Sequence, residues 1–365
     1  QYVNLYVFEL LIAGYVMWNI RIFAKISTFL RKQSLVLSYV IFFCMILMSL
    51  MWRSWDFNGT QNLVGVMYVG RLVLYGMFAY ILSRFEKDIQ FLKKSFWIYV
   101  VMLIVAGITQ IAFLPDFAPS LFFLGWDNHL ARVVGFFFDG TAAGVIYGMA
   151  ALFAIQKRYL TLATLSLLLF LGTFSRISYI GILGVLMYIE NSKFKIKNYP
   201  SRRMGILGIL SVLLLLLGFY VSRNPHGEGM RLLRTSTILA RYESIKEGIE
   251  VWRERPILGV GYGRVRYVRD LSAVDQRVES QRGASHAGNA FPSTYVTVLA
   301  SSGILGLGAF LFFLKKLWER ANDTQRKLLL FLAVTSLFDN VMLVNFIVVN
   351  FILLWNITKR QEVVT

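Results

Sequence analysis

Long apolar segments, separated by short polar ones, recur from one end of the sequence to the other. About 20 apolar residues are enough for a helix to cross the hydrocarbon core of a bilayer. Residues 159–189 are too many for one crossing, and the polar sequence GTFSR (Gly172 to Arg176) divides them into two short helices. The predicted spans are 3–20, 35–52, 63–83, 96–114, 133–155, the two halves of 159–189, 204–221, 293–314, 327–340 and 341–357. The pattern predicts an all-α fold, a polytopic membrane helical bundle of about eleven transmembrane helices.

The lysines and arginines between these spans fall in alternate loops, as expected if the basic loops are cytoplasmic. The basic segments are 21–32, 84–94, 157–158, 193–203, 315–327 and the tail at 359–360. Their alternation predicts a cytoplasmic C-terminus and an external residue 1, and it suggests a twelve-helix parent whose first helix is absent here. The predicted parts are helices 1–8 at residues 1–221, a long external loop at 222–292 between the eighth and ninth helices, and helices 9–11 with a cytoplasmic tail at 293–365.

Composition supports a membrane bundle and excludes several other classes. With 57% hydrophobic residues and a mean hydropathy of +0.59, the 365-residue chain is too apolar for a water-soluble core. Its net charge of +18 follows from the membrane topology, because the basic residues lie in short runs between spans, so no nucleic-acid partner is expected. The single cysteine, Cys44, lies in an apolar run, which excludes a disulfide framework and a thiolate metal site.

The external loop is rich in arginine. It contains twelve Lys or Arg residues, of which only Lys246 is a lysine, and eight Asp or Glu residues. A planar guanidinium can hold phosphate oxygens with two parallel hydrogen bonds, whereas lysine offers a point charge. A solvated loop held by salt bridges is one interpretation. The isolated positions of the arginines favour the other, an anionic ligand such as the phosphate of a lipid carrier or of acidic lipid headgroups.

Two further arginines stand where apolar helices begin or end: Arg132 in HLARVVGFFFDG and Arg176 in GTFSRISYIG. A charge at the edge of the hydrocarbon costs a few kcal/mol, so such residues usually face a wet cavity and serve a function. An interfacial anchor whose charged end reaches the headgroups is the competing interpretation. The short helices on either side of Arg176 favour a turn that lines a cavity.

From residue 125 to residue 310 the sequence resembles the O-antigen ligase and O-antigen polymerase family of bacterial surface-polysaccharide enzymes. Four segments resemble the family's motifs in order. They are Arg132 with Gly135, Phe137 and Gly144; the TFSR turn ending in Arg176; RYESIKEGIEVWRERPILGVGYG at residues 241–263; and STYVTVLASSGILGLG at residues 293–308. The resemblance implies a membrane glycosyltransferase that uses neither a metal nor a cofactor and transfers a glycan from undecaprenyl pyrophosphate to a sugar hydroxyl.

The resemblance also suggests roles for individual residues. Arg176 and Arg241 match positions that hold the pyrophosphate, with Arg132 as a third ligand. The family's histidine, which opens the last helix of the region and is thought to act as the base, is replaced by Pro292, so His286 becomes the catalytic candidate. Additional candidates are Glu243, as a second base or as the partner of an arginine, and the arginines Arg253 and Arg264.

Three functions fit this reading. A polymerase would join repeat units, and the absent family histidine favours it slightly, because that histidine is the more regular feature of the ligases. A ligase would transfer the glycan to lipid A core or another acceptor. A transporter or flippase of lipid-linked sugars would have internal repeats and mid-membrane charges. The expected partners are the lipid-linked donor, the glycan acceptor, the bilayer and, for a polymerase, a chain-length regulator. The expected location is the bacterial inner membrane, with the active site on the periplasmic face.

Overall fold

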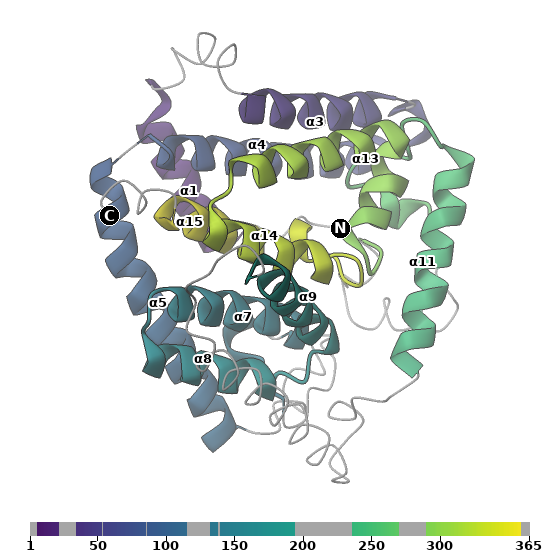
Figure 1. Ribbon diagram of the computed structural model, residues 1–365. Helices are drawn as coiled ribbons and strands as arrows, with labels where there is room; N and C mark the ends of the chain where they lie inside the picture. Colours follow the sequence, from purple (N-terminus) through teal and green to yellow (C-terminus); the bar gives the residue numbers. More distant parts are fainter. Residues whose placement is uncertain are drawn as a thin grey trace. The chain divides into compact units, whose positions relative to one another are not determined.

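The computed structural model describes residues 6–21, 34–52, 54–84, 86–114, 132–137, 139–193, 236–269 and 290–358, and all regular structure in these ranges is helical (Figure 1). The α-helices are α1 (Val7–Trp18), α3 (Ser34–Met51), α4 (Gly59–Leu82), α5 (Glu86–Phe113), α7 (Gly140–Gln156), α8 (Leu160–Gly172), α9 (Arg176–Lys193), α11 (Ser236–Glu254), α13 (Thr294–Arg320), α14 (Asp323–Thr335) and α15 (Asn345–Thr358). Short 3-10 helices are η2 (Ser54–Asp56), η3 (Gly135–Phe137), η5 (Val265–Tyr267) and η6 (Val341–Leu343). The predicted all-α class is confirmed for the described residues.

Four helices are long and apolar enough to cross a membrane: α3, α4, α5 over Gln90–Phe113, and α13. Shorter apolar helices are α1, α7, α8, α9 over Arg176–Ile189, and α15. These nine fall on predicted spans. The predicted span at 327–340 corresponds to α14, which ends at Thr335 and is not among these apolar helices. The predicted span at 204–221 lies outside the described residues, so the total of eleven stays a prediction.

Two boundaries differ from the prediction. Helix α7 begins at Gly140 and not at residue 133, because Gly135 has a φ of +53° and residues 132–134 have no regular secondary structure before η3. The expected junction at residues 340 and 341 is a longer break, from Ser336 to Val344, that contains η6.

The chain folds into two compact units. The first consists of Gln1–Lys93, Ala240–Gln325 and Leu343–Thr365, and the second of Lys94–Leu239 and Arg326–Met342. Each unit thus combines segments that are far apart in the sequence.

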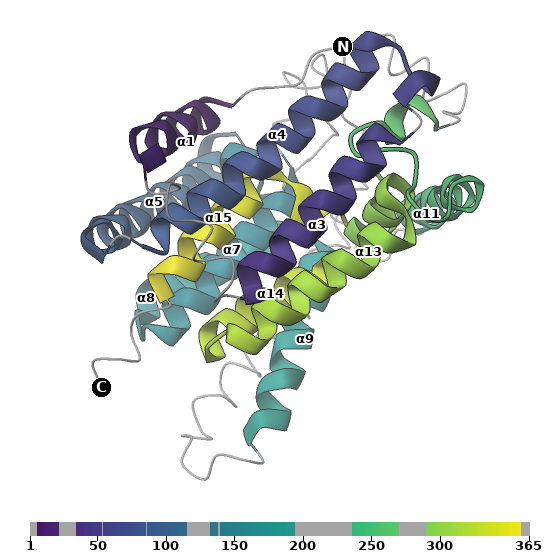
Figure 2. The same cartoon turned by 90° about the horizontal axis from the view of Figure 1, so that it is seen from above.

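In the first unit, α3 and α13 lie side by side in opposite directions (Figure 2). The ring of Tyr39, near the start of α3, contacts Phe313 near the end of α13, at 5.4 Å between centroids. At the other end, Ser49 Oγ donates a hydrogen bond of 2.6 Å to the carbonyl of Ser301. This opposite direction agrees with the predicted topology, in which the chain crosses the membrane one way in α3 and the other way in α13.

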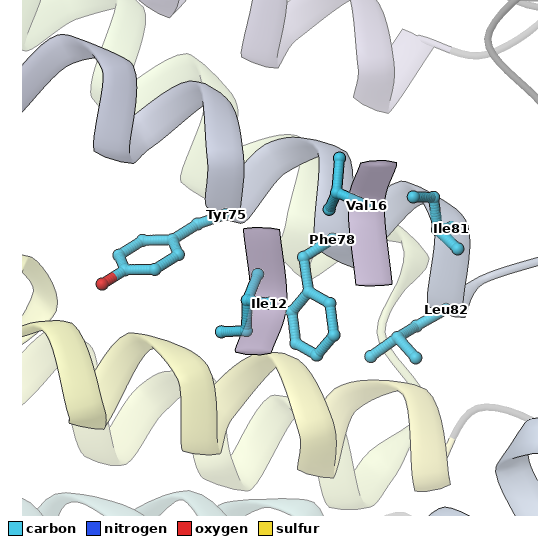
Figure 3. Packing of buried hydrophobic residues seen from close by; sticks show 6 residues of the cluster. All are labelled: Ile12, Val16, Tyr75, Phe78, Ile81 and Leu82. Atoms are coloured by element: carbon cyan, nitrogen blue, oxygen red, sulfur yellow. The ribbon is translucent and has the colours of Figure 1, made fainter. Parts of the chain in front are cut away.

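Helix α1 packs along α4 through a cluster of buried apolar side chains (Figure 3). The cluster comprises Ile12, Val16, Tyr75, Phe78, Ile81 and Leu82. Tyr15 meets the ring of Phe78 edge to face at 6.0 Å. Side chains of α15, including Val348 and Ile352, complete the cluster.

A buried ion pair joins the same two helices. Glu9 on α1 is 2% exposed and lies 2.5 Å from Nε of Arg71, which is in the middle of α4. Arg71 Nη2 donates a second hydrogen bond of 3.0 Å to Glu9, and the hydroxyl of Tyr75 donates a third of 2.5 Å. In the sequence Glu9 and Arg71 are each the single charged residue of an apolar segment. Such charges usually pair with each other inside a membrane protein, but this pair was not predicted.

We expect Glu9→Leu to destabilise the protein strongly, because it leaves the guanidinium of Arg71 buried without its carboxylate. Removing one partner of a buried ion pair typically costs about 3–5 kcal/mol, whereas replacing both partners with apolar residues is often nearly neutral. The midpoint of thermal unfolding in detergent should therefore fall for Glu9→Leu and recover in the double variant with Arg71→Met. Equal midpoints for the single variant and the wild type would show that the pair does not hold α1 to α4.

In the second unit, α7 is buried along almost its whole length between α8, α9 and α14. Its glycines allow this close packing. A Cβ at Gly144 would meet Thr173 and Ser178, and one at Gly148 would collide with Phe331 of α14. Small residues let apolar helices approach closely in a membrane.

Candidate active site

The TFSR turn joins α8 to α9 in the second unit. Helix α8 ends at Gly172, and Phe174 adopts a left-handed conformation with a φ of +48°, which is uncommon for a residue other than glycine. The buried hydroxyls of Ser175 and Ser178 are hydrogen-bonded to each other at 2.9 Å. Arg176 is then the first residue of α9 and is half-buried. The turn therefore places a guanidinium at the N-terminal, electropositive end of an apolar helix.

Arg132 reaches the same turn from an earlier part of the chain. Its side chain is 6% exposed, and its Nε donates a hydrogen bond of 2.8 Å to the carbonyl of Thr173. The guanidinium lies against Gly140, where a Cβ would lie only 2.7 Å from Arg132 Cζ. The structure thus brings together two of the sequence motifs, the arginine before α7 and the TFSR turn.

Gln110 of α5 holds the non-helical segment that carries Arg132. Its side-chain amide nitrogen donates to the carbonyl of Arg132 at 2.7 Å, and its oxygen accepts from the backbone nitrogens of Val134 and Gly135, each at 2.9 Å. Gln110 is 5% exposed, so this amide replaces the solvent that these backbone groups would otherwise need. Gln110 was not among the predicted site residues, although a polar amide side chain within an apolar span indicates a structural or functional role.

In the first unit, the glycine-rich turn after α11 fits into a break in α13. Gly303 has a φ of +67° and interrupts the helix. The carbonyls of Ala300 and Ser301 accept hydrogen bonds from the backbone nitrogens of Val260 and Gly261, at 3.0 and 2.9 Å. On the other side of the break, the nitrogen of Ile304 donates to the carbonyl of Pro256 at 2.9 Å. The turn therefore satisfies backbone groups that the break would leave unpaired.

This fit explains why glycine occupies the turn. Gly259, Gly261 and Gly263 all have left-handed φ values, of +67°, +103° and +77°. A Cβ at Gly259 would collide with the backbone of α13 at Ala300 and Ser301. Glycine is needed here both for its conformation and for the close approach of two backbones.

Arg264 follows the turn and is buried, with 1% of its surface exposed. Its Nη2 donates to the side-chain oxygen of Asn62, and the guanidinium lies 4.7 Å from the ring centre of Phe57. Nε and Nη1 have no hydrogen-bond partner among the described residues. Burial lowers the pKa of Arg264, and the nearby charge of Arg255 acts in the same direction.

Arg255 ties the same region to the loop between α3 and α4. Its Nη2 lies 3.0 Å from Oδ2 of Asp56, and its guanidinium is 5.9 Å from the ring centre of Phe57. The α3–α4 loop therefore lies at the same end of the first unit's helices as the glycine-rich turn. In this position Arg264 fixes the turn to α4 and does not face solvent.

Helix α11 carries Arg241, which is half-buried. A Cβ at Gly248 would meet Phe291 and Val296, so this side of α11 packs against the start of α13. A second attachment is Arg269, which lies 2.8 Å from Glu247 and places its guanidinium 4.9 Å from the ring centre of Phe291. Helix α11 is therefore anchored through its second half.

The remaining candidates are distributed unevenly. Glu243 and Arg253 lie on α11 with exposed side chains. Pro292 precedes Ser293, whose Oγ caps α13 by accepting from the nitrogen of Val296 at 3.4 Å. His286 lies outside the described residues. Arg241 belongs to the first unit and Arg132 and Arg176 to the second, so the convergence of Arg241 with the other two stays a prediction.

Residues 160–311 match the family model described as O-antigen ligase. The matched segment includes the TFSR turn, α11, the glycine-rich turn and the broken part of α13. Arg132 lies before it. No curated protein and no solved structure matches the chain. Among the described residues, no three His, Cys, Asp or Glu side chains are grouped to hold a metal ion.

Proposed function

We propose that this chain, whose residues 160–311 match the family model described as O-antigen ligase, is a ligase or polymerase of that family and transfers a glycan from undecaprenyl pyrophosphate to a sugar hydroxyl. The family makes it a membrane glycosyltransferase-like enzyme of surface-polysaccharide synthesis, and its apolar helices make it an integral membrane protein. The donor, the acceptor and the external position of the site are parts of the proposal.

The observation that carries the proposal is the meeting of Arg132 with the TFSR turn at the start of α9. Helix α8 has 13 residues and is therefore about 20 Å long, which is shorter than the hydrocarbon core of about 30 Å. If α8 starts at the cytoplasmic interface, its far end lies below the external surface of the bilayer. Guanidinium groups at this depth suit the diphosphate of a lipid carrier, whose prenyl chain stays in the membrane.

The proposed reaction needs charge stabilisation and one proton acceptor. The acceptor hydroxyl oxygen forms a bond to the anomeric carbon, and the bond from that carbon to the pyrophosphate oxygen breaks. The pyrophosphate leaves with the electron pair, and Arg176, Arg241 and Arg132 stabilise its growing negative charge. The hydroxyl proton passes to a base, for which His286 is our candidate because its ordinary pKa lies near neutrality.

A polymerase and a ligase are both consistent with the family. The description of the matched model favours a ligase, whereas Pro292, at the position of the family's histidine, favours a polymerase. Purified protein supplied with undecaprenyl pyrophosphate glycans would separate the two. A ladder of products means polymerisation, and one transfer to a core acceptor means ligation. Movement of the donor across the membrane without any transfer would contradict both and indicate a flippase. No observation supports a chain-length regulator as a partner.

A further inference from the structure

Helix α11 runs across the direction of the membrane helices of the first unit. In Figure 1, α3 and α4 run lengthwise across the view and α11 stands nearly at right angles to them, and Figure 2 shows α11 almost end on. The contacts of α11 lie at one end of these helices, through Gly248 with Val296 at the start of α13 and through the adjoining Arg255 with Asp56 after α3. If α3, α4 and α13 cross the bilayer, as their length and apolar character allow, α11 runs parallel to the membrane plane near one of its surfaces.

Helix α11 is also amphipathic in a specific way. Its apolar residues Ile238, Tyr242, Ile245, Ile249 and Trp252 follow the spacing i, i+4, i+7, i+11 and i+14, which places them on one stripe of the helix. This stripe lies next to the face that packs on the first unit, and the carboxylates of Glu243, Glu250 and Glu254 lie on the opposite, exposed face.

The first two residues of the stripe are not covered by the packing of α11, since Ile238 is 56% exposed and Tyr242 is 65% exposed. Ile245, Ile249 and Trp252 are half-buried, and Gly248 and Val251, on the neighbouring face, are buried. The helix begins at Ser236, well before its attachments at Ser244 and Glu247, which both contact Arg269. An in-plane helix with one apolar and one charged face is the arrangement that binds at the boundary between headgroups and acyl chains.

We propose that α11 is an interfacial helix whose stripe of Ile238, Tyr242, Ile245, Ile249 and Trp252 lies in the outer leaflet of the bilayer. The charged face then points to the aqueous side, and the anchored second half sets the depth of the helix. Arg241 lies between the stripe and the packed face, at the level of the lipid headgroups. This last consequence rests on the proposed function, because it is the depth at which the diphosphate of a lipid-linked donor would lie.

The lipid contact can be measured without any enzymatic assay. Cys44 is the only native cysteine, so a full-length Cys44→Ser protein allows one spin label to be placed at a time. The labelled positions are Tyr242→Cys and Ile249→Cys on the stripe, with Glu243→Cys and Glu250→Cys as matched controls one residue away on the charged face. The proteins would be reconstituted in vesicles of phosphatidylethanolamine and phosphatidylglycerol, and collision rates measured with oxygen and with a water-soluble nickel chelate.

We expect labels on the stripe to collide mainly with oxygen and labels on the charged face mainly with the nickel chelate, with at least a threefold difference in their ratio. Equal collision with the nickel chelate at all four positions would place α11 in water and overturn the proposal. Labels at 242 and 249 that are shielded from both reagents would show that protein covers the stripe, which also overturns it. Because this measurement does not depend on glycan transfer, it stands or falls separately from the proposed enzymatic activity.

Discussion

Replacing Arg176 with alanine is expected to abolish glycan transfer while the protein still inserts and folds normally. The side chain starts α9 and is half-buried beside a turn that Arg132 holds in place. Removal of one fixed donor that stabilises a developing anion typically lowers the turnover by about 10²- to 10³-fold. The loss should appear in the turnover at saturating donor, because the charge on the pyrophosphate grows as its bond to the sugar breaks.

Two comparisons make this experiment specific. Arg176→Lys keeps the charge but loses the planar fork, so it should restore only a small part of the activity. Arg158→Ala removes an exposed arginine from the opposite end of α8 and should leave transfer unchanged. Full turnover by Arg176→Ala in purified, correctly folded protein would remove this arginine from the mechanism. Arg132 is a poorer test, because its hydrogen bond to Thr173 also supports the turn.

The apolar helices could be predicted from the sequence because their signal is local. Length and hydropathy alone located α3, α4 and α13. The predicted start of α7 was wrong because Gln110, which lies on a different helix, holds the apolar residues after Arg132 in a non-helical segment. Local hydropathy does not indicate a hydrogen bond between segments that are distant in the sequence.

Helix α11 was not predicted because its helical periodicity of apolar residues is interrupted by many charged residues. Average hydropathy describes residues 222–292 as one hydrophilic loop, and the apolar stripe becomes visible only when the residues are placed on a helix. The glycine-rich turn posed a similar difficulty. Its glycines indicate tight backbone geometry, but only the break at Gly303 of α13 explains which backbone they approach.

The candidate arginines divide according to what surrounds them. Their edge positions in apolar runs predicted that Arg132 and Arg176 face a wet cavity, and this stays a prediction. The structure buries Arg132 and joins its segment to the turn before Arg176 through Thr173. Arg264 was an additional candidate for pyrophosphate binding, yet it is buried against Asn62 and Phe57, about 200 residues earlier in the chain. The burial of Arg264 could not be predicted, because the residues next to it in the sequence do not indicate that Asn62 and Phe57 are its partners.

Replacing Arg241 with alanine is the second change expected to abolish transfer, by a similar factor of about 10²- to 10³-fold. Lys246→Ala is the control, because Lys246 is a basic residue on the same helix with an exposed side chain and is not a candidate site residue, so its loss should have little effect. Helix α11 keeps its attachments through Glu247 and Gly248 in both variants, and the midpoint of thermal unfolding in detergent checks that each variant is folded. Equal activity of the two variants would contradict a special role for Arg241.

The double variant Arg176→Ala, Arg241→Ala tests whether the two units of the chain serve one site. Two groups that stabilise the same leaving group act together, so removing both should cost little more than removing either one. Two groups that serve separate steps or separate ligands should instead show losses that multiply. We expect the first result, with the turnover of the double variant within about tenfold of each single variant. Losses that multiply would mean that α11 and the TFSR turn do not hold a common diphosphate, and the proposed clamp would have to be abandoned.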